Sequence, residues 1–465
     1  MDKWVRNLED DLKAVIPFIE DKRVTDIAIG IGGELIVEGM GMGKVFTGIF
    51  FDDATTSPTA GTDRDMSKKY AKTEEELADI KYTEGKGTVY EVEYKDGLIT
   101  FNDMLDVPLE GKVEKGRFEG EDGAEIWDAF IAQMSLDDLI ISVSDNRGIL
   151  DVAKVLKKGN SVAEGPEGIL SKFKYGDTSR WATGFPTGPT YTATFDHEMQ
   201  KKFGGFFGEE ALYCGVASVN APGANINRVP YGSRASEYMS EDGVLNYNTA
   251  ANIIGEARRK GLIMNIKHCF LNNQEDGRQR IETYCNEQAI REIYLRPFEG
   301  ALTKGHGMGI MTSYNRIGAT YAATHSNLMN GVMRGEWKYR GFIIDDALTG
   351  SNTDPYSNGP AMIHNGTDLF CLDGRRGGDL KNYVTQNDDL QILKDMQRAN
   401  MYVMYALNQS WMGGLTEVSD EEIQANLNPW YLQAVTGAAI GLGSATAVVF
   451  GLYAFFEVMD RRKLA

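Results

Sequence analysis

Between about residue 124 and residue 413, short apolar runs alternate with stretches whose apolar residues follow helical spacing. The helical spacing is clearest at 287–299 and 327–335. The apolar runs have the length of strands and lie at 217–219, 262–266, 309–311, 342–344 and 369–372. Strands that alternate with helices along a chain are typical of parallel α/β sheets. The pattern predicts one α/β domain over 124–420.

Polar residues follow each of these apolar runs. The clearest case is the run from Gly341 to Ile344, which ends abruptly in Asp345 and Asp346. Taken alone, such an acidic pair is more typical of a loop than of a site. Because the carboxyl ends of parallel strands gather on one face of a barrel, five polar ends in the same position favour a shared site. We therefore predict a TIM-like (β/α) barrel with a polar pocket at that face.

The first 123 residues have a different pattern of apolar and polar residues. Residues 1–50 predict a small α+β segment, with a helix at 5–20 followed by strand-like runs. Residues 51–123 predict a linker and then a β-rich segment, because side chains alternate in polarity from Thr88 to Tyr94. We infer no function from residues 1–50 and expect the chemistry in the domain that follows.

Near the C-terminus, residues 429–458 form an apolar stretch that could cross a bilayer, which needs about 20 apolar residues. Arg461, Arg462 and Lys463 follow it, and Lys and Arg are enriched in cytoplasmic flanks. We predict one membrane-spanning helix in the cell membrane, with the tail 459–465 in the cytoplasm and the barrel on the extracellular side. The alternative is a buried core helix. Because the N-terminus lacks the apolar core of a secretory signal, export would use the tail helix, or the native N-terminus is missing or replaced.

Composition narrows the classes of function. Hydrophobic residues make up 42% of the 465, enough for a sizeable core, and the net charge of -19 repels phosphate backbones, so we exclude nucleic acid as a partner. The cysteines lack the spacing of a metal site, and we expect three of them, in or beside apolar runs, to pack in the core: Cys214, Cys269 and Cys371. The glycine-rich run 39–45 lacks the spacing of a phosphate-binding loop. We expect neither a metal nor a cofactor.

The predicted pocket collects side chains that suit a sugar. Arg234, Lys267, His268 and Tyr314 offer charged hydrogen bonds and aromatic surface to several hydroxyl groups. Asp346 adds a carboxylate that could attack a carbon atom or accept a proton. A cation beside Asp346 would keep it ionised, as a nucleophile must be.

At these residues the chain resembles glycoside hydrolase family 3. The resemblance covers roughly 124–413 and is carried by long motifs in the same order. They lie at 182–188 (ATGFPTG), 222–228 (PGANINR), 233–242 (SRASEYMSED), 266–275 (IKHCFLNNQE), 291–298 (REIYLRPF), 311–315 (MTSYN) and 334–342 (RGEWKYRGF). The resemblance implies a barrel domain that acts on β-linked sugars, most often β-glucosides, with retention of configuration.

Asp346 lies where this family has its nucleophilic Asp. The family usually has Ser-Asp-Trp there, whereas this chain has Asp345, Asp346 and Ala347. By this resemblance, the nucleophilic Asp is present in this chain, whereas the Trp that forms the floor of the sugar site in the family is absent. Tyr314 matches the aromatic residue near the nucleophile.

Three further positions match residues that hold sugar hydroxyls in the family, namely Arg234, Lys267 and His268. Glu164 stands where the family has Asp in an Asp-Gly-Pro motif that grips two hydroxyls of the terminal sugar. Its extra methylene would move the carboxylate about 1 Å deeper into the pocket, enough to disturb positioning. For Arg234, an ion pair with Glu237 within one loop is an alternative to a binding role.

The general acid/base is not assigned. A retaining enzyme needs a second carboxyl about 5–5.5 Å from the nucleophile. In most of the family a separate sandwich domain supplies it, and members with reversed domain order end, like this chain, in the barrel and a membrane helix. The residues before 124 do not show a sandwich pattern, and Asp345 is a poor candidate because neighbours on a strand point to opposite sides. A partner domain or chain is one source that could supply it, and the sequence does not decide the source.

These observations lead to one expected function and two alternatives. We expect hydrolysis of terminal β-linked sugars through a glycosyl–Asp346 intermediate, with a β-linked oligosaccharide or glycoside as the substrate and the bilayer as a partner of 429–458. The first alternative is a catalytically impaired, membrane-anchored sugar-binding relative. The second is a truncated or fused chain without a stable function.

Overall fold

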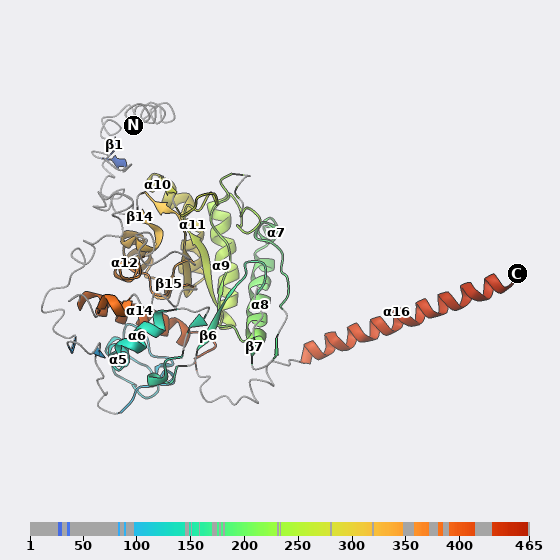
Figure 1. Cartoon of the computed structure of the whole chain (residues 1–465), viewed down its shortest axis with the longest axis horizontal. Coiled ribbons are helices and arrows are strands. Elements are labelled where there is room, and N and C mark those ends of the chain that lie inside the picture. Colours follow the sequence, from blue (N-terminus) through green and yellow to red (C-terminus); the bar gives the residue numbers. More distant parts are fainter. Residues whose placement is uncertain are drawn as a thin grey trace. The chain divides into compact units, whose positions relative to one another are not determined.

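The computed structural model describes the strands 27–29, 35–37, 82–83 and 88–89, and then 97–144, 148–149, 151–157, 159–169, 174–175, 178–179, 182–229, 232, 234–279, 281–318, 320–346, 358–371, 380–384, 390–413 and 430–463. The chain divides into two compact units, Met1–Thr416 and Glu417–Ala465 (Figure 1). The predicted helix at 5–20 and the linker at 51–75 lie outside the described residues.

A six-stranded sheet forms the centre of the first unit, in the order β15-β12-β10-β9-β6-β5. Five strands run parallel to one another, namely β6 (Asn160–Glu164), β9 (Ser218–Asn220), β10 (Ile263–Cys269), β12 (Gly309–Thr312) and β15 (Phe342–Ile344). β5 (Gly148–Ile149) pairs with β6 in the antiparallel sense. Every residue of β9, β10, β12 and β15 is buried, as expected for parallel strands covered on both faces.

Backbone pairing continues beyond β15 and returns to the first strand. Leu369 forms a parallel bridge with Ile344, and Phe370 forms one with Ser144. Four residues after Ser144, β5 pairs with β6. The structure therefore confirms an α/β fold with a parallel, barrel-type sheet. The five predicted apolar runs all take part in it, whereas β6 is a strand that the hydrophobic pattern did not reveal.

Helices connect the strands and cover the sheet. The larger ones are α5 (Gly123–Ala132), α6 (Leu136–Val143), α8 (His197–Cys214), α9 (Gly243–Arg259), α12 (Gly359–Asn365) and α14 (Leu390–Asn408). Local signals set their ends: Ser135 and Asp138 form a reciprocal capping box at the start of α6, and α8 ends at Gly215 in the left-handed conformation. The predicted helical segments at 287–299 and 327–335 form turns of mixed α and π type, made of α10 (Glu287–Ala289), η4 (Ile290–Tyr294), α11 (Arg296–Glu299) and η7 (Asn327–Glu336).

Shorter elements complete the first unit. They are β1 (Ile27–Ile29), β2 (Leu35–Val37), β3 (Tyr82–Thr83), β4 (Thr88–Val89), η2 (Asn102–Met104), η3 (Ala153–Val155), β7 (Lys174–Tyr175), β8 (Thr178–Ser179), α7 (Gly188–Thr192), β11 (Glu282–Thr283), η5 (Gly300–Lys304), β13 (Arg316–Ile317), β14 (Thr320–Tyr321) and η6 (Ala322–Thr324). β1 pairs with β2 and β3 with β4, both antiparallel, within segments where the sequence indicated strands.

Residues 97–122 belong to the packed core, although the sequence texture placed the start of the domain at 124. Ile99, Phe101, Met104 and Phe118 are buried in one hydrophobic cluster with residues of α5, α6 and α14. Trp127 of α5 donates its indole N–H to the carbonyl oxygen of Val107 at 3.1 Å. The apolar side chains of 97–122 are therefore part of what keeps the barrel folded.

The second unit contains α16 (Trp430–Lys463). Within it, Thr436–Phe456 is long and apolar enough to cross a membrane, by length and composition. Its side chains are exposed, which differs from the alternative of a buried core helix.

The helices α8 and α9 lie side by side (Figure 1). Their backbones approach closely at Gly204, where an added Cβ would lie 2.1 Å from the carbonyl oxygen of Ile253. The next residue, Gly205, faces open space, with no atom within 4 Å of such a Cβ. Close packing against α9 therefore requires glycine at position 204, whereas position 205 has room for a side chain.

We predict opposite effects for alanine at these two positions. Gly204→Ala should destabilise the protein by about 1–3 kcal/mol, because α8 must move away from α9. Gly205→Ala should stabilise it by about 1 kcal/mol, because alanine is the better helix former. Urea unfolding of both variants measures the difference, and equal stabilities would contradict the close packing of the two helices.

Candidate active site

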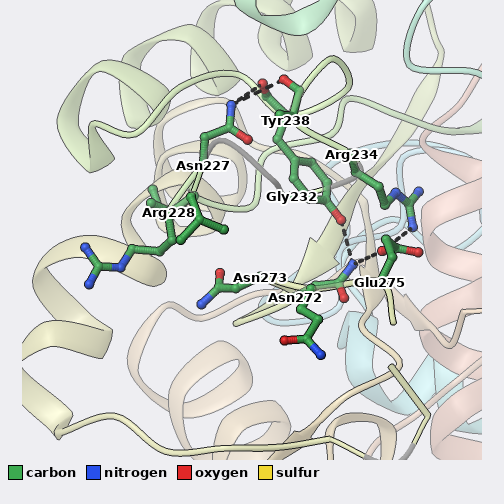
Figure 2. A pocket seen from close by; sticks show the side chains of 12 residues that line it. Asn227, Arg228, Gly232, Arg234, Tyr238, Asn272, Asn273 and Glu275 are labelled. Carbon is green, nitrogen blue, oxygen red and sulfur yellow. Dashed lines mark hydrogen bonds and ion pairs between the residues drawn. The ribbon is translucent and has the colours of Figure 1, made fainter. Parts of the chain in front are cut away.

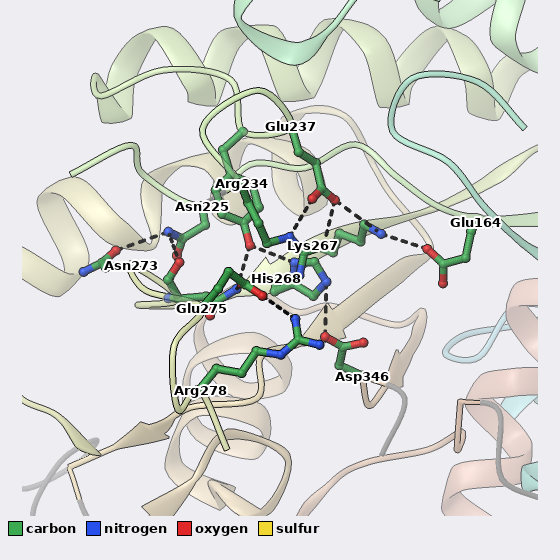
Figure 3. Close-up of polar contacts among 12 residues, drawn as sticks. Glu164, Asn225, Arg234, Glu237, Lys267, His268, Asn273, Glu275, Arg278 and Asp346 are labelled. Carbon is green, nitrogen blue, oxygen red and sulfur yellow. Dashed lines mark hydrogen bonds and ion pairs between the residues drawn. The ribbon is translucent and has the colours of Figure 1, made fainter. Parts of the chain in front are cut away.

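The candidate site residues come from the carboxyl ends of neighbouring strands, so the parallel sheet brings them together (Figure 3). Glu164 is the last residue of β6, and Lys267 and His268 lie near the end of β10. Tyr314 and Asp346 each follow a strand by two residues, β12 and β15 respectively.

Lys267 holds two acidic side chains from different parts of the chain. Its Nζ atom lies 2.9 Å from Oε2 of Glu164 and 3.4 Å from Oε1 of Glu237. Lys267 is only 4% exposed. Burial alone lowers the pKa of Lys267, but the carboxylates of Glu164 and Glu237 outweigh it, so the pKa is raised and the amine stays protonated.

Arg234 forms the ion pair with Glu237 that was the alternative to a binding role, and it also faces the site. Its guanidinium donates from Nε and Nη2 to the two Glu237 oxygens, at 2.6 and 3.0 Å, and its Nη1 lies 3.7 Å from Oε1 of Glu275. Burial raises the pKa of Glu237, but Lys267 and Arg234 outweigh burial and lower it. An ion pair with Glu237 and a role in sugar binding are therefore compatible for Arg234, because its partner Glu237 also faces Lys267 in the site.

His268 lies between Tyr238 and Asp346. Its Nε2 atom is 3.2 Å from Oδ2 of Asp346, and its Nδ1 atom is 3.0 Å from the Tyr238 hydroxyl. Burial, reinforced by the Arg234 and Lys267 cations, lowers the pKa of His268 well below its ordinary value. The neutral ring can accept a hydrogen bond from the Tyr238 hydroxyl at Nδ1, since Tyr238 itself accepts one from Asn272 at 2.7 Å. The ring then carries its own proton on Nε2, the atom that faces Asp346.

Two residues that the sequence did not single out complete the network around Tyr314. The Arg278 guanidinium lies 4.0 Å from the centre of the Tyr314 ring, and Arg278 Nη1 donates to Oε2 of Glu275 at 2.6 Å. Burial and the charge of Asp346 raise the pKa of Tyr314, in keeping with a tyrosine beside the carboxylate. The available signal was the polar run after β10, which contains both Glu275 and Arg278.

Asp345 has a different environment from Asp346. It is fully buried, and its Oδ1 atom accepts the backbone N–H of Cys371 at 2.6 Å. Its carboxylate therefore connects β15 to the strand segment that follows it in the barrel. Asp346 keeps some exposure, at 8%.

A small pocket adjoins this network, between the loop after β9 and the loop after β10 (Figure 2). Arg234, Tyr238, Asn272 and Glu275 line both the pocket and the network. Asn225 joins the two loops, since its Oδ1 accepts the backbone N–H of Asn272 at 2.9 Å and its Nδ2 donates to the backbone oxygen of Asn272 at 3.1 Å. The pocket is thus framed by polar side chains held in place by the loops themselves.

The six residues proposed from the sequence therefore lie in one connected set of contacts: Glu164, Arg234, Lys267, His268, Tyr314 and Asp346. Such a set offers several cationic and neutral hydrogen-bond donors around one largely buried carboxylate, that of Asp346. Across the described part of the chain, no cluster of His, Cys, Asp and Glu could hold a metal ion. Cys214, Cys269 and Cys371 are buried, as predicted.

Comparison with known proteins gives a family similarity for the same region. The model of the glycosyl hydrolase family 3 N terminal domain matches residues 166–397. A β-glucosidase of Bacteroides ovatus is 33% identical over 191 residues, which are 40% of this chain and 26% of that protein. An exo-α-(1→6)-L-arabinopyranosidase of Bifidobacterium breve is 34% identical, over 40% of this chain and 26% of that protein. The chain thus spans about a quarter of the length of these curated relatives.

Solved structures show a similar fold. A β-glucosidase of Bifidobacterium adolescentis superposes with a TM-score of 0.56 at 26% identity, over 62% of this chain and 41% of that one. β-Glucosidase 3B of Thermotoga neapolitana, in complex with glucose, superposes with a TM-score of 0.54 at 23% identity, over 65% of this chain and 46% of that one. The second likeness shows the fold alone.

We predict that Glu237→Gln destabilises the protein by about 1.5–3 kcal/mol at pH 7, because the buried Lys267 and the half-buried Arg234 lose a charged partner. The pKa of Glu237 is lowered in the folded state. Its stabilising effect is therefore present above the pKa of an unfolded Glu, about 4.3, and is lost as the pH falls through the folded pKa. Urea unfolding from pH 7 to pH 3 should show the two proteins converging at the acid end.

The exposed Glu119 provides a control, since Glu119→Gln removes the same charge from the surface. This variant should unfold like the wild type at every pH. If the free energy of unfolding of Glu237→Gln stays below that of the wild type by the same amount at every pH, the assigned ion pairs would be contradicted.

Proposed function

The chain belongs to glycoside hydrolase family 3 through the N-terminal domain at residues 166–397, and from this premise we propose that it hydrolyses terminal β-linked sugars with retention of configuration. One observation carries the proposal. Asp346 lies at the end of a barrel strand, 3.2 Å from His268, in a network with three cationic side chains. Such surroundings favour an ionised carboxylate, as a nucleophile requires.

In the proposed reaction, an oxygen of Asp346 attacks the anomeric carbon of the terminal sugar. The bond between that carbon and the leaving-group oxygen breaks, and the leaving group takes a proton from a general acid. Water then gives a proton to the deprotonated general acid and attacks the anomeric carbon of the glycosyl–Asp346 intermediate. The bond to Asp346 breaks, the sugar is released, and both the carboxylate and the general acid are restored. His268 would hold one oxygen of Asp346 through its Nε2–H, because its lowered pKa keeps the ring neutral.

The remaining side chains would hold the sugar. Lys267, Arg234 and Arg278 supply charged donors, and Glu164, with a 43% exposed side chain, supplies an acceptor at the opposite side of the set. Tyr314 lies beside Asp346 and would support the ring near the reacting carbon. Glucose is the first sugar to test, since several relatives are β-glucosidases, and an aryl α-L-arabinopyranoside is the second.

We propose that a partner domain or chain supplies the general acid/base. The relatives are about four times longer than the matched region, and Asp345 uses its carboxylate to bind the backbone of Cys371. An aryl leaving group of low pKa departs without a proton and needs no general acid. Turnover of an aryl glycoside therefore tests the role of Asp346 independently of the general acid.

A catalytically impaired sugar-binding protein is the second candidate function. The observation that favours it is Glu164, whose two oxygens contact Lys267 and Asn220, at 2.9 and 2.5 Å. Each Glu164 oxygen keeps a lone pair that could receive a sugar hydroxyl, but the carboxylate as a whole would hold the sugar with fewer hydrogen bonds. Binding of glucose without turnover of an aryl β-glucoside would distinguish this candidate from the enzyme.

We further propose that α16 anchors the protein in the cell membrane as a single span. Its apolar part, Thr436–Phe456, precedes Arg461, Arg462 and Lys463, which would stay in the cytoplasm with the barrel outside. The division into a barrel domain at 124–420, a membrane helix at 429–458 and a tail at 459–465 stays a prediction.

The first prediction concerns the nucleophile. Asp346→Ala should lower turnover of 4-nitrophenyl β-D-glucopyranoside on the order of 10⁴-fold, as loss of a nucleophile does. A 2-deoxy-2-fluoro-β-D-glucoside with a good leaving group should label the wild type on the peptide that contains Asp346, as located by mass spectrometry. Label on any other residue would refute the assignment, and Glu119→Gln should label like the wild type.

The second prediction concerns the membrane helix. The full chain should stay in the membrane fraction after an alkaline wash. Leu442→Arg combined with Phe450→Arg should release it, because an Arg near the centre of a span costs about 2.5–3.5 kcal/mol. Gly443→Ala keeps the helix apolar and should remain membrane-bound. Release of the wild type by the wash would contradict a spanning helix.

A further inference from the structure

Asn220, the last residue of β9, is a buried side chain with polar contacts on both ends of its amide. Its Nδ2 atom donates to Oε1 of Glu164 at 2.5 Å, and its Oδ1 atom accepts from Nδ2 of Asn265 at 2.9 Å. Glu164 and Asn265 belong to the two strands that flank β9 in the sheet. Asn220 therefore links three neighbouring strands at the end where the candidate site lies.

Asn265 determines which way the Asn220 amide points. Asn265 is fully buried in β10, and its Nδ2 donates to both Ser218 Oγ and Asn220 Oδ1, each at 2.9 Å. The absence of a side chain at Gly309 makes room for it, since a Cβ there would lie 1.9 Å from Asn265 Oδ1. Because Asn265 occupies the oxygen of the Asn220 amide, the amide nitrogen is the group that faces Glu164.

The same amide nitrogen faces the nucleophile side of the barrel. It lies 4.0 Å from the Cys371 Sγ atom. The backbone N–H of Cys371 is in turn held by Asp345, the neighbour of Asp346. A short series of contacts thus joins the segment beside the nucleophile to Glu164 on the other side of the site.

Glu164 needs such a contact. Its side chain is 43% exposed and is one methylene longer than an aspartate, so Lys267 alone would leave the carboxylate free to pivot about one ion pair. With Asn220 on Oε1 and Lys267 on Oε2, both oxygens are fixed in place. We propose that Asn220 is a positioning residue, which holds the Glu164 carboxylate in the orientation that receives the terminal sugar. This inference rests on the proposed function of the site.

The alternative is that the Asn220 amide only contributes to the stability of the sheet. The two roles differ in what they predict for sugar recognition. A structural amide affects unfolding and leaves the Michaelis constant unchanged, whereas a positioning amide changes recognition of the sugar more than it changes the chemical step.

The first test uses Asn220→Ala in the full chain, with 4-nitrophenyl β-D-glucopyranoside as the probe. We expect KM to rise about 10-fold, as for loss of one hydrogen bond to a charged group, with a change in kcat under about 3-fold. Asn400→Ala is the matched control, since Asn400 is a buried asparagine that donates to two backbone oxygens, those of Leu139 and Met396. It should lower the melting temperature and leave KM unchanged. Equal KM values for Asn220→Ala and the wild type would overturn the inference.

The second test changes charge and keeps shape. Asn220→Asp would place a second carboxylate against Glu164, whose other charged neighbour is Lys267, itself shared with Glu237. Like charges at this distance favour uptake of a proton, so the rise in KM should diminish as the pH is lowered from 7 to 5. The effect should also disappear when Glu164→Gln is added, because one charge of the pair is then gone. If the rise in KM caused by Asn220→Asp is independent of pH and remains in the double variant with Glu164→Gln, Asn220 has a structural role only.

A test without a sugar separates this inference from the proposed function. If the wild type neither hydrolyses nor binds the glucoside, the proposed function fails, but the position of Glu164 can still be observed in crystal structures of the wild type and Asn220→Ala. We expect the Glu164 carboxylate to leave its position against β9 in the variant. A carboxylate that keeps the same position in both structures would overturn the positioning role.

Discussion

The buried amine of Lys267 is the constraint on which the candidate site depends. A charge that is only 4% exposed must be compensated, and removing its carboxylate partners would leave the Lys267 ammonium unpaired and away from water. The two compensating carboxylates, Glu164 and Glu237, come from a strand and a loop that lie far apart in the sequence. Charge compensation therefore ties the strand end of β6 and the loop after β9 to the centre of the sheet.

The same cations determine the state of the residues around the nucleophile. Arg234 and Lys267 reinforce the effect of burial on His268, so its ring stays neutral and can donate to Asp346. Arg278 stacks on Tyr314 and binds Glu275, which connects the other side of the pocket to Arg234. One carboxylate thus lies among several fixed donors, an arrangement suited to forming and breaking a bond at a sugar carbon.

Much of the fold and part of the site follow from local sequence patterns. Runs such as 342–344 and 263–266 are buried on both faces, so their composition alone marks them as central strands. β6 escaped notice because Asn160 and Ser161 interrupt its apolar character, yet its parallel pairing with β9 makes it a barrel strand. Asn220 at the end of β9, and Glu275 and Arg278 in the polar run after β10, carry only the general signal of polar residues that follow an apolar run, which does not distinguish a site residue from a loop residue.

The sequence by itself determined the parallel α/β class, the polar strand ends that include Lys267, His268 and Asp346, and an apolar helix at 436–456. These follow from periodicity and composition, which report the surroundings of each segment. Only the tertiary structure decided the pairings, such as Glu164 with Lys267 across 103 positions, and the burial of 97–122 against α14. Pairings depend on which strands become neighbours in space, and hydrophobic spacing holds no information on distance between residues so far apart in the chain.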